Sequence, residues 1–221
     1  NVQQIITGSE ANPEQAYAKE TLPNGQKPNL IVIMNESFSD LSVLGDFEST
    51  PDYMPFVHSL AGSKNTITGT MRVSTFGGGT CNTEFEFLTG NTLAFFPTSS
   101  IVYQQYINSD LPSLATNLKA QGYSADAVHP YYGYCWKRDE VYPLLGFDHF
   151  YDLDSFHNAK MIGIFVSNCV SDESDFEKVI DLFENKQEGQ PMFLFNVTMQ
   201  NHGGYSRLIN APEESVHMEM D

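Results

Sequence analysis

Basic residues are scarce in this sequence. Only 11 Lys and Arg stand against 28 Asp and Glu, which gives a formal net charge of −17. The shortage argues against nucleic acid as a partner, because phosphate backbones are held mainly by clustered Lys and Arg. It also argues against a broad electrostatic contact with anionic lipid surfaces. An anionic ligand would therefore have to be bound by a local site.

Long apolar runs are also missing. No segment approaches the roughly 20 apolar residues of a membrane helix, and residues 1–26 are too polar for a signal peptide. The three cysteines show no metal-ligand spacing and cannot all pair, which excludes a disulfide scaffold. Because the chain begins at Asn1 rather than Met, we expect a soluble piece of a longer protein whose membrane segment lies elsewhere.

The material that is present suits one folded domain. The 221 residues are 41% hydrophobic and 13% aromatic, which is too apolar for a disordered acidic segment. Residues 1–28 have few apolar positions and several prolines, and they are interpreted as a linker. Residues 29–221 are expected to form the domain.

Apolar runs and turn signals predict alternating strands and helices. Strands are expected at 29–34, 123–128 and 191–199, with a weaker candidate at 65–73. Helices are expected at 50–62, 81–88, about 111–122, and after Ser174. Pro51 after Thr50 marks the first helix start. The alternation predicts an α/β fold with a mainly parallel sheet and helices on both faces.

Polar side chains follow three of the predicted strands. Glu36 follows the first strand, His129 follows the middle one, and His202 follows the last. Ligands of open α/β sheets gather beyond the carboxyl ends of the strands, so these three side chains are expected at one edge. A lone histidine is more often a structural hydrogen-bonding group. The shared edge makes a binding site an equal alternative.

A glycine-rich segment, 75–85, precedes the second predicted helix. Its three glycines allow close backbone approach to a ligand, and Thr80 is expected at or near the helix N-terminus. Free N–H groups there favour an anion and lower the pKa of a hydroxyl nucleophile. No Lys precedes Thr80, so the segment is not a P-loop. The alternative is an ordinary turn with Thr80 as N-cap.

Four segments together resemble the lipoteichoic acid synthase group. These are phosphoglycerol transferases with a sulfatase-like domain, within the alkaline phosphatase superfamily. The segments are NLIVIMNES at 29–37, GGTCNTEF at 78–85, His129 followed by CWKR at 135–138, and TMQNH at 198–202. They occur in the order of the group, and the resemblance spans roughly residues 28–206. On this resemblance, residues 29–221 are the N-terminal part of a sulfatase-like catalytic domain.

The resemblance implies a role for each matching residue. Thr80 matches the threonine nucleophile that carries a glycerophosphate intermediate. Glu36 matches the carboxylate that binds a divalent metal, usually manganese, together with that threonine. The residues implied to hold the glycerophosphate group are His129, Trp136, Arg138 and His202. As an alternative, Trp136 and Arg138 only pack against and cap a helix that begins near Cys135.

The sequence departs from the group's pattern in two places. The Asp-His pair that completes the group's metal site is absent downstream of His202, and the remaining Asp148-His149 matches a structural stretch. On this basis the metal site is expected to be incomplete and the chain inactive. Tyr131 replaces a side chain that is often polar in the group. Sulfatases proper are disfavoured, because the segment after Thr80 lacks the Cys/Ser-x-Pro-x-Arg motif of their formylglycine nucleophile.

The resemblance implies transfer of glycerophosphate from a phosphatidylglycerol-type lipid to a glycan or a polyglycerophosphate. The parent protein would act at the outer face of the bacterial cytoplasmic membrane. A phosphodiesterase of the same superfamily, in which water takes the intermediate, is one alternative. A non-catalytic module that binds glycerophosphate polymers is the other.

Overall fold

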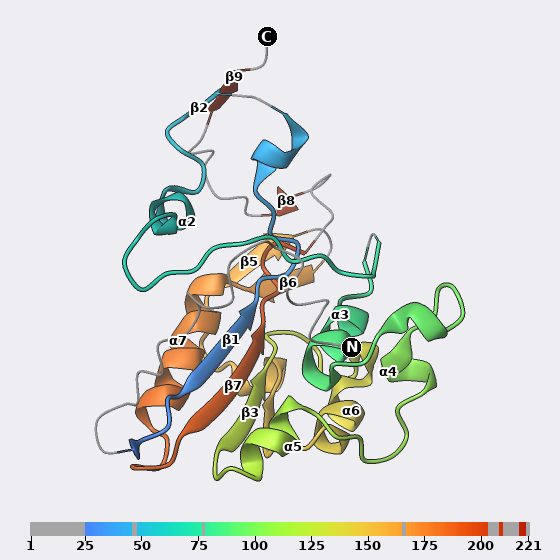
Figure 1. Cartoon of the computed structure of the whole chain (residues 1–221). Coiled ribbons are helices and arrows are strands. Elements are labelled where there is room, and N and C mark those ends of the chain that lie inside the picture. The colour runs from blue at the N-terminus through green and yellow to red at the C-terminus, as the bar shows by residue number, and fades with distance from the viewer. Residues whose placement is uncertain are drawn as a thin grey trace.

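The computed structural model describes residues 25–45, 48–76, 78–164, 167–202, 208–209 and 217–219. The described residues form a central four-stranded sheet in which every neighbouring pair is parallel. Its strands, in spatial order, are β1 (Leu30–Met34), β7 (Met192–Val197), β3 (Ser124–Val128) and β4 (His149–Tyr151). Figure 1 shows the three longest strands side by side at the centre of the domain. The predicted α/β class and mainly parallel sheet are confirmed.

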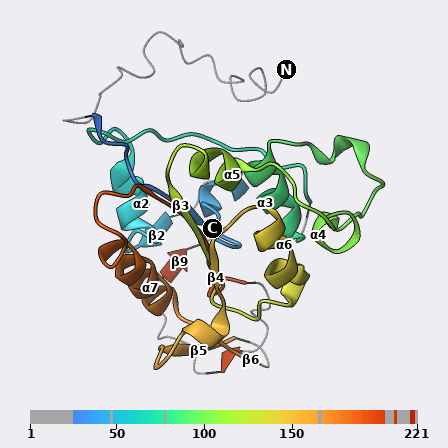
Figure 2. The same ribbon diagram turned by 90° about the horizontal axis from the view of Figure 1, so that it is seen from below.

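Helices cover both faces of this sheet. The long helix α7 (Asp172–Glu184) lies on one face, and α3 (Thr80–Thr89), α5 (Leu114–Lys119) and α6 (Arg138–Leu144) lie on the other (Figures 1 and 2). The remaining described helices are short: α2 (Pro55–Leu60), α4 (Val102–Gln105), and the 3₁₀ turns η2 (Leu41–Leu44), η3 (Leu93–Phe95), η4 (Cys135–Lys137) and η5 (Leu153–Ser155).

Two small antiparallel sheets accompany the main one. In the first, β2 (Glu48–Thr50) pairs with β9 (His217–Glu219). In the second, β5 (Met161–Ile164) lies between β6 (Ser167–Val170) and β8 (Leu208–Ile209). None of these strands was predicted from the sequence.

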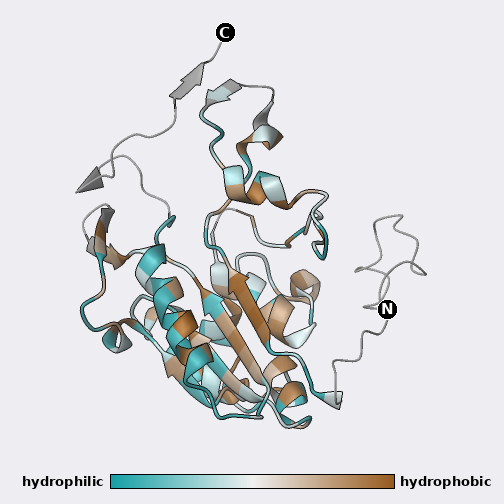
Figure 3. Ribbon diagram, turned by 90° about the vertical axis from the view of Figure 1, so that its left-hand side faces the viewer, coloured by the Kyte–Doolittle hydropathy of each residue, from teal (hydrophilic) through white to brown (hydrophobic). Residues whose placement is uncertain are grey.

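Strand β7 is central because its sequence, MFLFNV, is buried at all six positions. Phe193 and Phe195 belong to the main core, which also includes residues of α3, α5 and α6. Leu194 faces the opposite way, into a smaller cluster with Val179 of α7. A strand covered on both faces requires such a continuous apolar run. Figure 3 shows the brown, hydrophobic strands beside the mostly teal, hydrophilic ribbon of α7.

Several predicted boundaries need correction. The helix expected from Thr50 begins at Pro55, because Pro55 takes the first helical position and Thr50 belongs to β2. Residues 65–73 contain no strand, so the alternation there was misleading. Helix α7 starts before Ser174, with the Ser171 side chain accepting a hydrogen bond from the Ser174 N–H as N-cap.

Most of the predicted linker 1–28 lies outside the described residues. In the part of the chain that the structure describes, no helix combines the length and the apolar character needed to cross a membrane. The linker assignment and the position of any membrane segment therefore stay predictions.

Candidate functional site

The carboxyl ends of β1 and β7 fix the backbone around Glu36. The N–H of Thr198, just after β7, donates to the carbonyl of Met34 at 3.1 Å. In return, the N–H of Glu36 donates to Thr198 Oγ1 at 3.0 Å, and this hydroxyl donates to Asn35 Oδ1 at 3.1 Å. Thr198 is fully buried, so it holds Glu36 from the neighbouring strand. Sequence reasoning placed Thr198 in a motif but gave it no role.

Thr80 contacts Glu36 directly. Its hydroxyl donates a hydrogen bond to Glu36 Oε2 at 2.7 Å, although the two residues are 44 positions apart. The N-cap of α3 is Gly79, which adopts a left-handed conformation (φ 75°) that suits glycine, and no side chain caps the helix. Thr80 is the first helical residue, so its interpretation as an N-cap is wrong. Its hydroxyl is instead directed at a carboxylate beside the positive end of a ten-residue helix.

Glu36 and Thr80 supply two adjacent oxygen ligands, the type that hard divalent cations prefer. Among the described residues, no group of three or more His, Cys, Asp or Glu side chains is arranged to hold a metal ion. The pair therefore fits part of a metal site. The manganese expected from the resemblance stays a prediction.

Asp148 and His149 lie elsewhere in the fold. Asp148 accepts a hydrogen bond from the N–H of Ala125, near the start of β3, and forms an ion pair with Lys119. The Nδ1 atom of His149 lies 2.8 Å from Asp126 Oδ1 in the middle of β3. These contacts lie toward the amino-terminal side of the sheet, opposite to Glu36. They agree with the structural role expected for this Asp-His pair.

His129 follows β3 and is only 3% exposed. Its Nδ1 lies 2.8 Å from the carbonyl oxygen of Val197, which can only accept, so Nδ1 carries the proton. Burial lowers the pKa of His129 well below its usual value, and the positive charge of nearby Arg138 lowers it further. The imidazole is therefore neutral at pH 7, with an unprotonated Nε2.

Arg138 is held by a buried carboxylate that sequence reasoning missed. The guanidinium donates from Nε to Glu84 Oε1 at 3.1 Å and from Nη2 to the same oxygen at 2.5 Å. The hydroxyl of Tyr142 donates to Glu84 Oε2 at 2.7 Å. Exposure is 2% for Arg138 and zero for Glu84. Burial alone would lower the pKa of Arg138, but the Glu84 carboxylate outweighs it and raises this pKa, so the guanidinium is charged at any ordinary pH.

A signal for Glu84 was present in the sequence. Glu84 stands four residues after Thr80 on α3, and residues four apart share one face of a helix. Its neighbours Cys81, Phe85 and Leu88 are buried core residues. A charged residue within such an apolar segment needs a partner of opposite charge, and Arg138 is that partner. The helix that presents Thr80 therefore also fixes the arginine.

Trp136 and His202 complete the predicted set. Trp136 has left-handed backbone angles (φ 59°), and its half-buried side chain packs against the main core. His202 is exposed, and its N–H donates to the carbonyl of Met199 at 3.0 Å. The structure thus joins Thr80 to Glu36 and brings Arg138 near His129. His202 also contributes to the lowered pKa of His129, so these two imidazoles lie near one another. The roles of Trp136 and His202 in binding glycerophosphate stay predictions.

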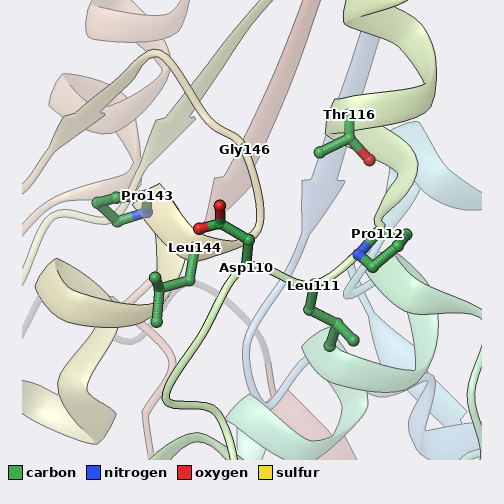
Figure 4. Close-up of a pocket in the computed structure, with 7 residues that line it drawn as sticks. All are labelled: Asp110, Leu111, Pro112, Thr116, Pro143, Leu144 and Gly146. Atoms are coloured by element: carbon green, nitrogen blue, oxygen red, sulfur yellow. The ribbon is translucent and has the colours of Figure 1, made fainter.

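A separate pocket of about 410 Å³ contains none of the predicted residues (Figure 4). It lies between the start of α5 and the end of α6. Its lining residues are Asp110, Leu111, Pro112, Thr116, Pro143, Leu144 and Gly146. With one carboxylate and otherwise mostly apolar groups, it offers little to a phosphate ester. The candidate site is therefore the strand edge around Glu36 and Thr80.

Comparison with known proteins assigns the domain to a family. The sulfatase family profile matches residues 28–217. The chain belongs to the sulfatase family. The chain is 27% identical to the Streptococcus pyogenes phosphoglycerol transferase GacH, solved with sn-glycerol-1-phosphate, with a TM-score of 0.71. The lipoteichoic acid synthase LtaP from Listeria monocytogenes shares the fold, with a TM-score of 0.65 at 22% identity. The predicted resemblance to such transferases is confirmed.

Curated relatives extend the comparison. A putative cyclic beta-1,2-glucan modification protein from Rhizobium meliloti (strain 1021) is 42% identical over 179 residues, covering 81% of this chain and 26% of that protein. Lipoteichoic acid synthase from Staphylococcus aureus (strain USA300) is 29% identical over 142 residues, covering 61% and 22%. The match covers 88% of this chain and 49% of GacH, and 91% of this chain and 46% of LtaP. The chain therefore spans about half of the solved relatives and about a quarter of these curated ones.

Proposed function

We propose that this sulfatase-family domain transfers glycerophosphate through a covalent intermediate on Thr80. The Thr80 oxygen attacks the phosphorus of a phosphatidylglycerol-type lipid, a Thr80 O–P bond forms, and the P–O bond to diacylglycerol breaks. The proton of Thr80 leaves for a neighbouring base, and the diacylglycerol oxygen takes up a proton. A hydroxyl of the acceptor then displaces Thr80 from phosphorus, and the threonine hydroxyl is restored.

The observation that carries this proposal is the 2.7 Å hydrogen bond from Thr80 to Glu36 at the start of α3. A hydroxyl bonded to a carboxylate is oriented and made more nucleophilic. The helix N-terminus favours the negative charge that gathers on phosphoryl oxygens. Buried Arg138 supplies a fixed positive charge near His129, which favours an anionic ligand at this edge.

Because His129 is neutral, we propose different roles for His129 and His202. With the proton on Nδ1, the Nε2 of His129 can accept a hydrogen bond from a substrate hydroxyl but cannot donate one. His202, by contrast, is exposed to solvent. We assign to His202 the delivery of a proton to the leaving diacylglycerol oxygen.

A divalent metal, with manganese as the candidate, is part of the proposal. Glu36 and Thr80 would hold it through their oxygens. Such an ion would lower the pKa of the Thr80 hydroxyl and neutralise charge on the phosphoryl oxygens. Two protein ligands alone bind a cation weakly. We therefore propose that residues 1–221 alone are inactive and that a longer form of this domain is needed for turnover.

The same reasoning gives the proposed partners and location. The donor is a glycerophospholipid and the acceptor is a glycan or polyglycerophosphate, so the parent protein would work at the outer face of the bacterial cytoplasmic membrane. Sulfate-ester hydrolysis is disfavoured, because the segment that begins at Thr80 carries neither the Pro nor the Arg of the formylglycine motif.

Diacylglycerol release from a fluorescent phosphatidylglycerol tests the proposal, in a form of the domain as long as its solved relatives. We expect Thr80→Ala to abolish release and Thr80→Ser to restore part of it. Thr83→Ala, at a half-buried position on the same helix, is the matched control and should retain activity. Undiminished release by Thr80→Ala would contradict the mechanism. Release that added glycan or glycerol acceptors never capture would indicate a phosphodiesterase, and binding without release would indicate a non-catalytic module.

A further inference from the structure

Three tyrosines continue outward from His129 along the loop that follows β3. Ring centroids lie 6.3 Å apart between His129 and Tyr131, 5.0 Å between Tyr131 and Tyr132, and 5.2 Å between Tyr132 and Tyr134. The last pair is stacked, with 23° between the ring planes. We call Tyr131, Tyr132 and Tyr134 the tyrosine row.

The tyrosine row becomes more exposed as it leaves the site. His129 is 3% exposed and Tyr131 is half-buried, whereas Tyr132 is 42% and Tyr134 is 66% exposed. Aromatic rings that remain in water cost free energy, and neighbouring exposed rings often mark a binding surface. The row connects such a surface to a site residue.

The backbone holds the tyrosine row in place without a ligand. The carbonyl of Tyr131 accepts a hydrogen bond from the N–H of Leu153 at 3.0 Å. The N–H of Gly133 donates to Asp152 Oδ2 at 3.2 Å, and a Cβ at Gly133 would lie only 2.7 Å from that oxygen. The close approach requires glycine at this position. A surface fixed in this way loses little conformational entropy when it binds.

The charges around the tyrosine row indicate an uncharged ligand. Four acidic residues lie close to the tyrosine row in the sequence or in the segment that anchors it. Asp139 and Glu140 are at the start of α6, and Asp152 and Asp154 are in the anchoring segment. Lys137 is the one exposed basic side chain among them. Together with the net charge of −17, this setting disfavours an anionic membrane or a polyglycerophosphate chain. A sugar ring has an apolar C–H face and a polar rim, which suit a tyrosine ring and its hydroxyl.

We propose that the tyrosine row is the acceptor subsite of this domain and that it binds a neutral glucan, with a sugar hydroxyl directed toward His129. The proposal rests on the transfer function proposed above and specifies its acceptor. The relative named as a putative cyclic beta-1,2-glucan modification protein supports the choice of a glucan.

Trp136 provides the assay. It is the single tryptophan of the chain and lies two residues beyond Tyr134, so its fluorescence should change when a glucan occupies the row. We expect titration with cyclic β-1,2-glucan to give saturable binding. Tyr132→Ala and Tyr134→Ala should each weaken it about three- to ten-fold, the loss typical of one aromatic contact. Tyr134→Phe should bind nearly as well as the wild type.

Phe95→Ala is the matched control. Phe95 is 89% exposed on η3, beyond the end of α3 that is remote from Thr80, so its loss should leave glucan affinity unchanged. Calorimetry with sn-glycerol-1-phosphate should give the same affinity for Tyr134→Ala and the wild type. Circular dichroism of each variant checks that the fold is retained.

The possible outcomes separate this inference from the proposed function. If glycerol phosphate binds but the glucan does not, the acceptor subsite is wrong and the transfer function stands. If phosphatidylglycerol vesicles, and not the glucan, require Tyr132 and Tyr134, the row faces lipid and the inference is overturned. If the glucan binds through the row but glycerol phosphate does not bind, the inference is supported as a binding site and the transfer function is in doubt.

Discussion

Removal of Glu84 should destabilise the fold strongly. Its carboxylate is fully buried and is the acceptor for Arg138 and Tyr142. In Glu84→Ala the guanidinium would remain in the core, 2% exposed, without a counter-charge. Breaking a buried ion pair by removing one partner costs about 3–5 kcal/mol. Because domains of this size are stable by only about 5–15 kcal/mol, we expect a large drop in the urea midpoint.

A double variant separates the ion pair from simple packing. Glu84→Leu combined with Arg138→Met replaces both charges by apolar groups of similar size. Such replacements are often neutral or stabilising, so the double variant should unfold at higher urea than Glu84→Leu alone. As a control, Glu173→Ala removes the exposed ion pair with Lys160 and should leave the midpoint nearly unchanged. A loss below about 1 kcal/mol for Glu84→Ala would refute the reasoning.

Three further results are expected. First, burial raises the pKa of the Asp175 carboxyl in the folded protein to about 7, so the free energy of unfolding falls as the pH rises from about 4 to 7. In urea titrations, Asp175→Asn should be more stable than the wild type at pH 8, by up to about 4 kcal/mol, and equal to it at pH 4. Second, burial lowers the pKa of His129 in the folded protein, so on acidification the unfolded chain binds a proton at this imidazole before the folded protein does. The free energy of unfolding of the wild type should therefore fall by about 1.4 kcal/mol per pH unit below pH 6.5, and His129→Gln should lack this contribution. The same pH dependence in both proteins would contradict the neutral imidazole. Third, calorimetry should show weak Mn²⁺ binding by residues 1–221 that Glu36→Gln abolishes, and binding unaffected by this change would exclude Glu36 as a ligand.

The parts of the fold that sequence reasoning predicted are those with a strong local signal. Strands β1 and β7 were found because both are runs of apolar residues. The run at β7 is buried at all six positions, whereas in β1 the side chains of Ile31 and Ile33 are exposed. Helix α3 was found because Gly90 ends it in the left-handed conformation. The strand expected at 65–73 was wrong, since a strand needs a partner and alternation alone provides none. Short strands such as β4 were missed for the converse reason, because their pairing depends on contacts distant in sequence.

The candidate site divides in the same way. The rule that ligands gather beyond the carboxyl ends of parallel strands placed Glu36 and His129 at one edge of the sheet. The hydrogen bond from Thr80 to Glu36 lies at this edge. The rule could not find Glu84, because its buried ion pair is set by packing between α3 and α6. Arg138 was expected to face the substrate, and its use of two donors on Glu84 shows a structural duty that its motif does not reveal.

Mass mapping of the protein after incubation with a phosphatidylglycerol donor tests the central claim most directly. The domain should be as long as its solved relatives, and the acceptor should be omitted so that the intermediate accumulates. The account predicts one glycerophosphate group on the peptide that contains Thr80, and none in Thr80→Ala. Glycerophosphate on another residue, such as neighbouring Cys81, or diacylglycerol release that continues in Thr80→Ala, would contradict it.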